Sequence, residues 1–221
     1  MTYLASALLS YTILIPLVVA LVRVHKIRTS YFPFLVLLLL AFTTEVASEI
    51  SLRLTRENTA ISNIYSLLEI GVILWQFHAW GFLRRRRALL IVLAALSFIT
   101  WITENIGYGR LETHFCSATV FLNSLIVVFL CINEINALIA SYSGTLLRNA
   151  RFLICLGLMT ISIYSLITEG TLLIDPQNAV IDWPIFYIFS ITNAIVNVVY
   201  AIAVFFIPVR DDYYFSRRFK A

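Results

Sequence analysis

The chain has 221 residues, of which 61% are hydrophobic and only 13% are charged, and its formal net charge is +4. A soluble domain carries about a quarter charged residues, so this composition excludes an ordinary water-soluble fold and predicts an integral membrane protein. The basic residues lie in short clusters between apolar runs rather than along one face, which argues against a nucleic-acid partner.

Seven apolar segments follow one another along the chain. A helix needs about 20 mainly apolar residues to cross the hydrocarbon core of a bilayer, and none of the segments alternates with the period of a strand. In chain order they are Tyr3–Val24, Tyr31–Leu52, Ala60–Leu83, Ala88–Asn105, Phe115–Tyr142, Arg151–Ile174 and Trp183–Pro208. The sequence therefore predicts an all-α polytopic membrane protein, a bundle of seven transmembrane helices (residues 1–208) with a short basic tail (residues 209–221).

The basic residues predict the orientation of these helices. Loops that stay in the cytoplasm are enriched in Lys and Arg. If the N-terminus lies outside, only Arg53, Arg56 and Arg110 of the 16 Lys and Arg residues fall in outer loops. We therefore expect the N-terminus outside and the C-terminus in the cytoplasm. The run Arg84–Arg87 then marks a cytoplasmic loop that also meets anionic lipid.

Carboxylates recur within the predicted spans, although ionisable groups are costly inside a bilayer. In the expected orientation Glu45, Glu49 and Glu69 lie in the outer half of the membrane. Glu49 can pair with Arg53 one helical turn later, whereas Glu45 and Glu69 have no such neighbour. We predict an acid-lined cavity that opens to the outside. Its candidate ligand-binding residues are Glu45, Glu49, Glu69, Asn63, Tyr65 and Trp101.

Further polar residues recur at helical spacing and form a predicted secondary polar interior. Asn123 and Glu134 are eleven residues apart, which is three turns, so they share a face of one helix. Asn193 and Asn197 share a face of the last helix. These faces should turn inward because lipid offers no hydrogen bonds. Polar residues in membrane helices often only join helices, and we interpret the three asparagines mainly in this way.

No catalytic residue, metal or cofactor is predicted. A covalently bound retinal needs a lysine within a span, and the two lysines, Lys26 and Lys220, lie outside the spans. The histidines are spread over both membrane faces, so no metal-site spacing appears. The three cysteines lie in or beside apolar segments without disulfide spacing and are interpreted as packing residues. An enzyme that acts on lipid with carboxylates alone is left open.

The segment Asn63-Ile-Tyr65-Ser-Leu-Leu-Glu69, followed by the basic loop, resembles a group of small, uncharacterised seven-helix bacterial inner-membrane proteins. The resemblance covers most of the chain. It implies the same architecture and a bacterial inner-membrane location, and it implies no particular activity.

Three functional hypotheses follow. The leading one is a non-enzymatic receptor or sensor that binds a small cationic or hydroxyl-rich ligand, an ion or a lipid in the outward-facing cavity and acts through a separate partner. The second is a small proton- or solute-coupled transporter that uses the same carboxylates. The third is an intramembrane lipid-modifying enzyme, which is least favoured because the sequence shows no arrangement of nucleophile or metal-ligand residues.

Overall fold

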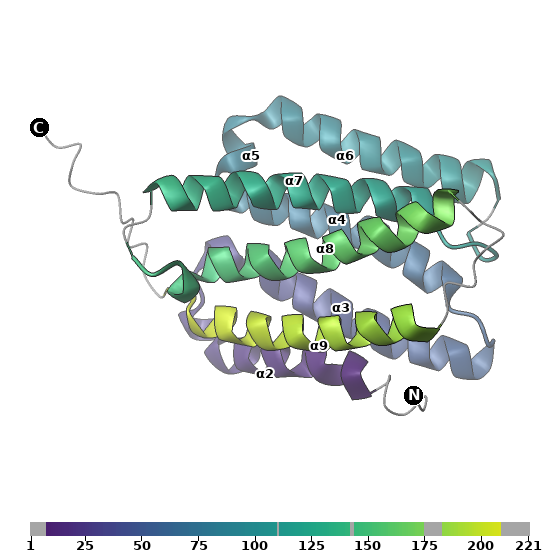
Figure 1. Ribbon diagram of the computed structural model, residues 1–221, viewed down its shortest axis with the longest axis horizontal. Helices are drawn as coiled ribbons and strands as arrows, with labels where there is room; N and C mark the ends of the chain where they lie inside the picture. The colour runs from purple at the N-terminus through teal and green to yellow at the C-terminus, as the bar shows by residue number, and fades with distance from the viewer. Residues whose placement is uncertain (1–7, 110, 142–143, 175–182, 209–221) are drawn as a thin grey trace, which may run out of the picture.

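The computed structural model describes residues 8–109, 111–141, 144–174 and 183–208, and these contain helices but no strand. Seven helical segments among them are long and apolar enough to cross a membrane (Figure 1). They are Leu8–Lys26, Thr29–Leu54, Thr59–Trp80, Arg87–Gly107, Ser117–Ser141, Ala150–Thr171 and Ile188–Phe205. The all-α, seven-span prediction is therefore confirmed. The predicted tail, residues 209–221, lies outside the described residues.

The helices follow the predicted apolar runs closely. The α-helices are α2 Leu14–Arg23, α3 Phe32–Leu54, α4 Thr59–Trp80, α5 Phe82–Arg85, α6 Arg87–Ile102, α7 Ser117–Ser141, α8 Ala150–Ile174 and α9 Trp183–Phe205. Helix α4 ends at Trp80 because Gly81 adopts a left-handed conformation with φ 103°. The short helix α5 then leads into α6, and a π-helical turn, Thr103–Gly107, extends α6.

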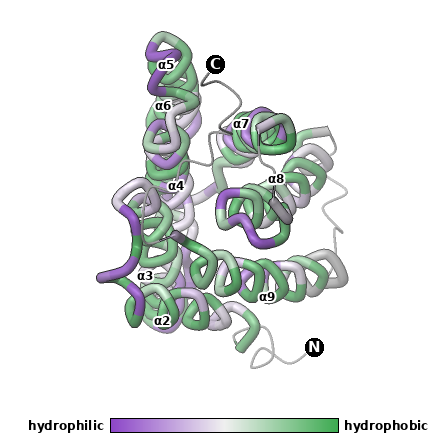
Figure 2. The backbone as a smooth tube through the Cα atoms, turned by 90° about the vertical axis from the view of Figure 1, so that its left-hand side faces the viewer, coloured by the Kyte–Doolittle hydropathy of each residue, from purple (hydrophilic) through white to green (hydrophobic). Residues whose placement is uncertain are grey.

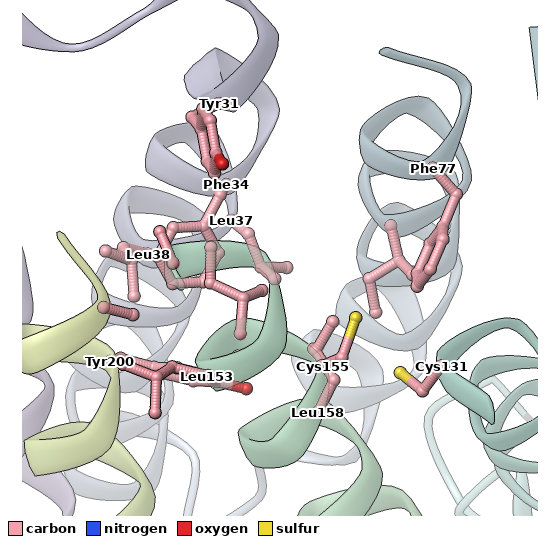
Figure 3. Close-up of a cluster of buried hydrophobic side chains, with 14 of the residues drawn as sticks. Tyr31, Phe34, Leu37, Leu38, Phe77, Cys131, Leu153, Cys155, Leu158 and Tyr200 are labelled. Atoms are coloured by element: carbon pink, nitrogen blue, oxygen red, sulfur yellow. The ribbon is translucent and has the colours of Figure 1, made fainter. Parts of the chain in front are cut away.

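Six of the spans pack into a bundle, and α6 lies at its edge. Helix α7 packs along α8, α8 along α9, α3 along α4, and α2 along α9. Helix α6 contacts mainly α4 and α7 and runs along one side of the molecule (Figures 1 and 2). Fully buried side chains such as Phe34, Phe77 and Leu38 fill the core between the other helices (Figure 3).

The surface of the bundle is apolar while much of its polar content is inside. Large hydrophobic side chains such as Val22, Ile91 and Ile167 are exposed, whereas Asn63 and Asn197 are fully buried. In water this arrangement would expose a large apolar area to solvent. In lipid it is favourable, because the apolar side chains face the acyl chains and the polar groups find partners only inside the bundle. The distribution of polarity thus agrees with a multi-pass membrane protein.

Polar contacts join the first span to the last. The Asn197 amide donates to the Thr12 hydroxyl at 2.9 Å. At the other end of the same pair, the Arg23 guanidinium donates to the Val204 carbonyl at 3.1 Å and also to the Phe205 carbonyl. These carbonyls lie in the last turn of α9, where helix carbonyls begin to lack N–H partners within the helix. The Val204 carbonyl also accepts from the Ile207 amide, at 3.3 Å. Asn197 therefore acts as a joint between helices, as its sequence interpretation proposed.

Candidate functional site

A cavity of about 90 Å³ lies inside the bundle, between α3, α4, α7, α8 and α9. Apolar residues such as Leu37, Ile73 and Val127 form part of its wall. Its polar wall consists of Ser66, Glu69, Asn123, Ser124, Ser162, Ser165 and Tyr200. The cavity has room for roughly three water molecules, and its one carboxylate is Glu69. Of the six residues predicted to line an acidic cavity, only Glu69 lines this one.

Glu69 is positioned by its own helix. The Tyr65 hydroxyl, one turn earlier on α4, donates a hydrogen bond of 2.9 Å to Oε1 of Glu69. The Glu45 carboxylate on α3 acts electrostatically on Tyr65, and Glu69 does so on Tyr200 of α9. Three of the candidate residues, Glu45, Tyr65 and Glu69, therefore gather in one region between α3 and α4. A cation or a proton in the cavity would offset the negative charge of an ionised Glu69.

Asn123 supplies a second functional group to the cavity wall. Its Nδ2 donates to the Ser66 carbonyl at 3.3 Å, while its buried Oδ1 has no hydrogen-bond partner among the described residues. A buried acceptor without a partner costs about 1–3 kcal/mol. A ligand or water that donates a hydrogen bond would remove this cost. The cavity therefore offers a carboxylate and an amide oxygen to a donor.

Asn63 closes one end of the bundle rather than lining the cavity. Its Nδ2 donates to the carbonyls of Leu111 and His114, both at 2.9 Å, and its Oδ1 accepts from the Cys116 amide at 3.0 Å. The side chain is fully buried. Asn63 thus fixes the loop before α7 over the start of α4, and we call this side of the molecule the Asn63 end.

Cys116 connects this loop to the cavity. Its thiol lies 3.2 Å from the hydroxyl of Ser66, a cavity residue. Burial raises the pKa of the Cys116 thiol, so the thiol stays protonated near neutral pH. Trp101 Nε1 donates to the Asn63 carbonyl at 2.7 Å and so supports the same closure from α6. This role of Cys116 could not be predicted from helical spacing, because the contact joins residues 50 positions apart.

Glu104 holds the start of α7. Its two carboxylate oxygens accept hydrogen bonds from the backbone amides of Ala118 and Thr119, at 3.1 and 2.9 Å, and from the Thr119 hydroxyl at 2.8 Å. A carboxylate at a helix N-terminus satisfies free amides and is stabilised by the helix dipole. Glu104 therefore has a structural role, even though it belongs to the acids at the edges of the spans.

A charged cluster closes the opposite side, which we call the Arg151 end. Glu134, 6% exposed, accepts a hydrogen bond from Arg151 at 3.3 Å. The Arg151 guanidinium also lies over the Trp80 ring, 5.6 Å from its centroid, and Tyr31 packs edge-on against Trp80. The sequence prediction included Glu134 in the polar interior but named Arg151 as the first residue of the sixth span, so it missed the pair.

The cavity and the charged cluster are connected by the geometry of three helices. Each helix carries one residue at the cavity and another, eleven residues away, at the Arg151 end. The pairs are Glu69 and Trp80 on α4, Asn123 and Glu134 on α7, and Ser162 and Arg151 on α8. Eleven residues are three helical turns and about 16 Å. The cavity and the Arg151 end therefore lie on the inward faces of the same three helices. Apolar side chains and the buried thiols of Cys131 and Cys155 lie between them (Figure 3).

The other predicted residues lie elsewhere. Glu49 forms an ion pair of 2.7 Å with Arg53 on the surface of α3, as the one-turn spacing predicted. Asn193 is half-buried on α9 and is not part of the cavity wall. Of the ten residues that the sequence proposed for the site and its polar interior, Glu69 and Asn123 line the cavity. Of the others, Asn63, Trp101 and Glu134 close its ends, and Asn197 joins the first span to the last.

No family model, curated protein or solved structure matches the chain. The resemblance to bacterial inner-membrane proteins therefore stays a prediction. In the part of the chain that the structure describes, no group of three or more His, Cys, Asp or Glu side chains could hold a metal ion. The function must accordingly be argued from the cavity and its two closures.

Proposed function

We propose that the protein is a membrane receptor or sensor that binds a small cation, or a small hydroxyl-rich molecule, in the cavity beside Glu69 and acts through a separate partner. The observation that supports this proposal most strongly is that the Glu69 carboxylate and Asn123, whose Oδ1 has no hydrogen-bond partner among the described residues, line the same cavity. Both groups accept hydrogen bonds, and both lie where lipid cannot supply a donor.

The size and chemistry of the cavity narrow the ligand class. A volume of about 90 Å³ admits only a few non-hydrogen atoms. An ammonium group could donate to the carboxylate and to the amide oxygen, and the four serine hydroxyls could hold the waters around it. An anion would be repelled by Glu69. A small primary ammonium ion is the ligand that fits these constraints best.

The proposal includes a location. We place the protein in a bacterial inner membrane, with its N-terminus outside and its C-terminus in the cytoplasm, on the strength of the basic loops and the resemblance described above. The Asn63 end would then face the outside, and the Arg151 end would face the cytoplasm. A ligand that contacts Ser66 and Asn123 could act on the closure at Cys116, and along α7 on the Glu134–Arg151 pair.

Binding can be tested with the purified protein in lipid nanodiscs, using methylammonium, sodium and glycerol as probes. A ligand that binds only the folded state raises the thermal unfolding midpoint saturably. We expect methylammonium to do so, Glu69→Gln to abolish the shift, and Glu49→Gln, a matched control outside the cavity wall, to retain it. A shift that is unchanged in Glu69→Gln, or the absence of a saturable shift with every probe, contradicts the proposal.

The transporter remains the second candidate, and one observation favours it. The cavity is closed by different residues at the Asn63 end and at the Arg151 end. Alternating access requires two such separate closures. Proteoliposomes distinguish the two functions. A transporter accumulates labelled methylammonium at a rate that depends on Glu69, whereas a receptor binds it without flux.

A further inference from the structure

A second hollow lies on the outside of the bundle, in the groove between α4 and α6. Its volume is about 730 Å³, far larger than the interior cavity. The wall is almost wholly apolar, and its α4 side runs from Leu67 to His78 while its α6 side runs from Leu90 to Phe98. Because α6 lies at the edge of the bundle (Figure 2), the groove faces the surrounding hydrocarbon.

Small residues make the groove deep. Gly71 lies in its floor, and a Cβ added there would meet no atom within 4 Å. Ala94 and Ala95 face it from α6. Ser97 also lines the groove, 1% exposed, and its hydroxyl has no hydrogen-bond partner among the described residues. The two helices therefore leave a space that no side chain of the described chain fills.

Positive charge lies at one mouth of this groove. Leu90, the first groove residue on α6, donates its backbone amide to the carbonyl of Arg86, one helical turn earlier. Arg86 belongs to the run Arg84–Arg87, whose four side chains are all exposed. The Arg86 guanidinium lies over the Phe82 ring, 5.3 Å from its centroid. The groove thus begins in a cluster of arginines and continues towards the membrane interior.

We propose that this groove binds an anionic phospholipid, with one acyl chain between α4 and α6 and its phosphate headgroup at Arg86 and Arg87. Charge complementarity selects the occupant: the mouth carries four positive side chains and the groove is apolar. A flexible acyl chain can follow an irregular hollow, and arginine binds phosphate by paired hydrogen bonds. The site is separate from the Glu69 cavity, whose residues it does not share, apart from Ile70.

The experiment measures lipid that remains bound to the purified full-length protein, by native mass spectrometry, after exchange into equal amounts of phosphatidylglycerol and phosphatidylcholine. We expect phosphatidylglycerol to be retained preferentially. Arg86→Gln combined with Arg87→Gln should lower its retention roughly tenfold, since each basic residue near the headgroups contributes to anionic-lipid binding. The matched control, Lys26→Gln combined with Arg28→Gln, removes the same charge from another loop and should change retention little.

The acyl-chain half of the site has its own test. Gly71→Leu should fill the groove and lower retention of both lipids, while Ala137→Leu, on an exposed face of α7, should not. Equal retention of the two lipids, or equal loss in the two double variants, would overturn the proposal. So would unchanged retention in Gly71→Leu. Conversion of a dimer to a monomer by Gly71→Leu, with lipid retention unchanged, would instead assign the groove to a second copy of the chain.

Discussion

Asn63 is the residue on which the closure of the Asn63 end depends. Its side chain makes three hydrogen bonds to carbonyl and amide groups of the loop before α7. Replacement by alanine leaves those three groups unsatisfied, at about 1–3 kcal/mol for each that stays buried. We expect Asn63→Ala to lower the thermal unfolding midpoint and to expose the buried Cys116 thiol to maleimide, as measured by the rate of alkylation.

A matched control is available on α7. Among the described residues, Asn133 donates only to the Phe129 carbonyl of its own helix, at 2.8 Å. Asn133→Ala should therefore leave both the midpoint and the alkylation rate near those of the parent. If Cys116 reacts as slowly in Asn63→Ala as in the parent, the closure does not depend on this amide.

The contrast between Glu49 and Asn63 shows what could be predicted at this scale. The Glu49–Arg53 pair is visible in the sequence because both residues lie on one helix, one turn apart. The partners of Asn63 lie about 50 positions away, and Glu134 pairs with Arg151 on the next helix. Helical spacing tells which residues share a face, but it does not tell how each helix is rotated towards its neighbours. The contacts between helices could therefore not be predicted from the sequence.

Helices α8 and α9 approach each other closely at Gly157. A Cβ at this position would lie 2.4 Å from Cε1 of Tyr200 and 3.0 Å from Cγ1 of Val196. Gly157→Ala must therefore move Tyr200, which lines the Glu69 cavity. Overpacking of this kind costs about 1–3 kcal/mol. We expect a lower unfolding midpoint and a loss of the methylammonium-dependent shift.

Gly71→Ala serves as the matched substitution, because nothing lies within 4 Å of the added atom. Alanine is favoured over glycine within a helix by roughly 0.5–1 kcal/mol, so this variant should unfold at the same temperature or slightly higher. An equal effect of the two substitutions would show that helix flexibility, and not the contact with Tyr200, sets the stability.

The helices themselves could be predicted well from the sequence. The fourth predicted span, Ala88–Asn105, overlaps α6 and its π-helical turn, and the fifth, Phe115–Tyr142, contains α7. Length and hydrophobicity suffice here, since a bilayer imposes both. What they could not show is that α6 lies apart from the bundle core, because all seven segments are similarly apolar. For that reason the groove between α4 and α6 could not be predicted from the sequence.

For the molecule as a whole, the cavity lies between two closures of different chemistry. The Asn63 end is held by neutral hydrogen bonds to a loop, and the Arg151 end by an ion pair between α7 and α8. Breaking one partner of a buried ion pair is costly, whereas a loop can open locally at a smaller cost. A ligand would therefore enter the cavity from the Asn63 end. Which side of the membrane it comes from depends on the orientation of the bundle.

The distribution of basic residues predicts that orientation, with the Asn63 end outside. The three native cysteines are buried, so a cysteine added on the surface can be labelled over a low background. Glu57, beside the start of α4, and Arg85, on α5, are both exposed. We expect an impermeant maleimide to label Glu57→Cys in intact cells, and to label Arg85→Cys only after the membrane is permeabilised. Labelling in the reverse order would place the Arg84–Arg87 run outside, so that the ligand would enter from the cytoplasm and the phospholipid from the outer leaflet.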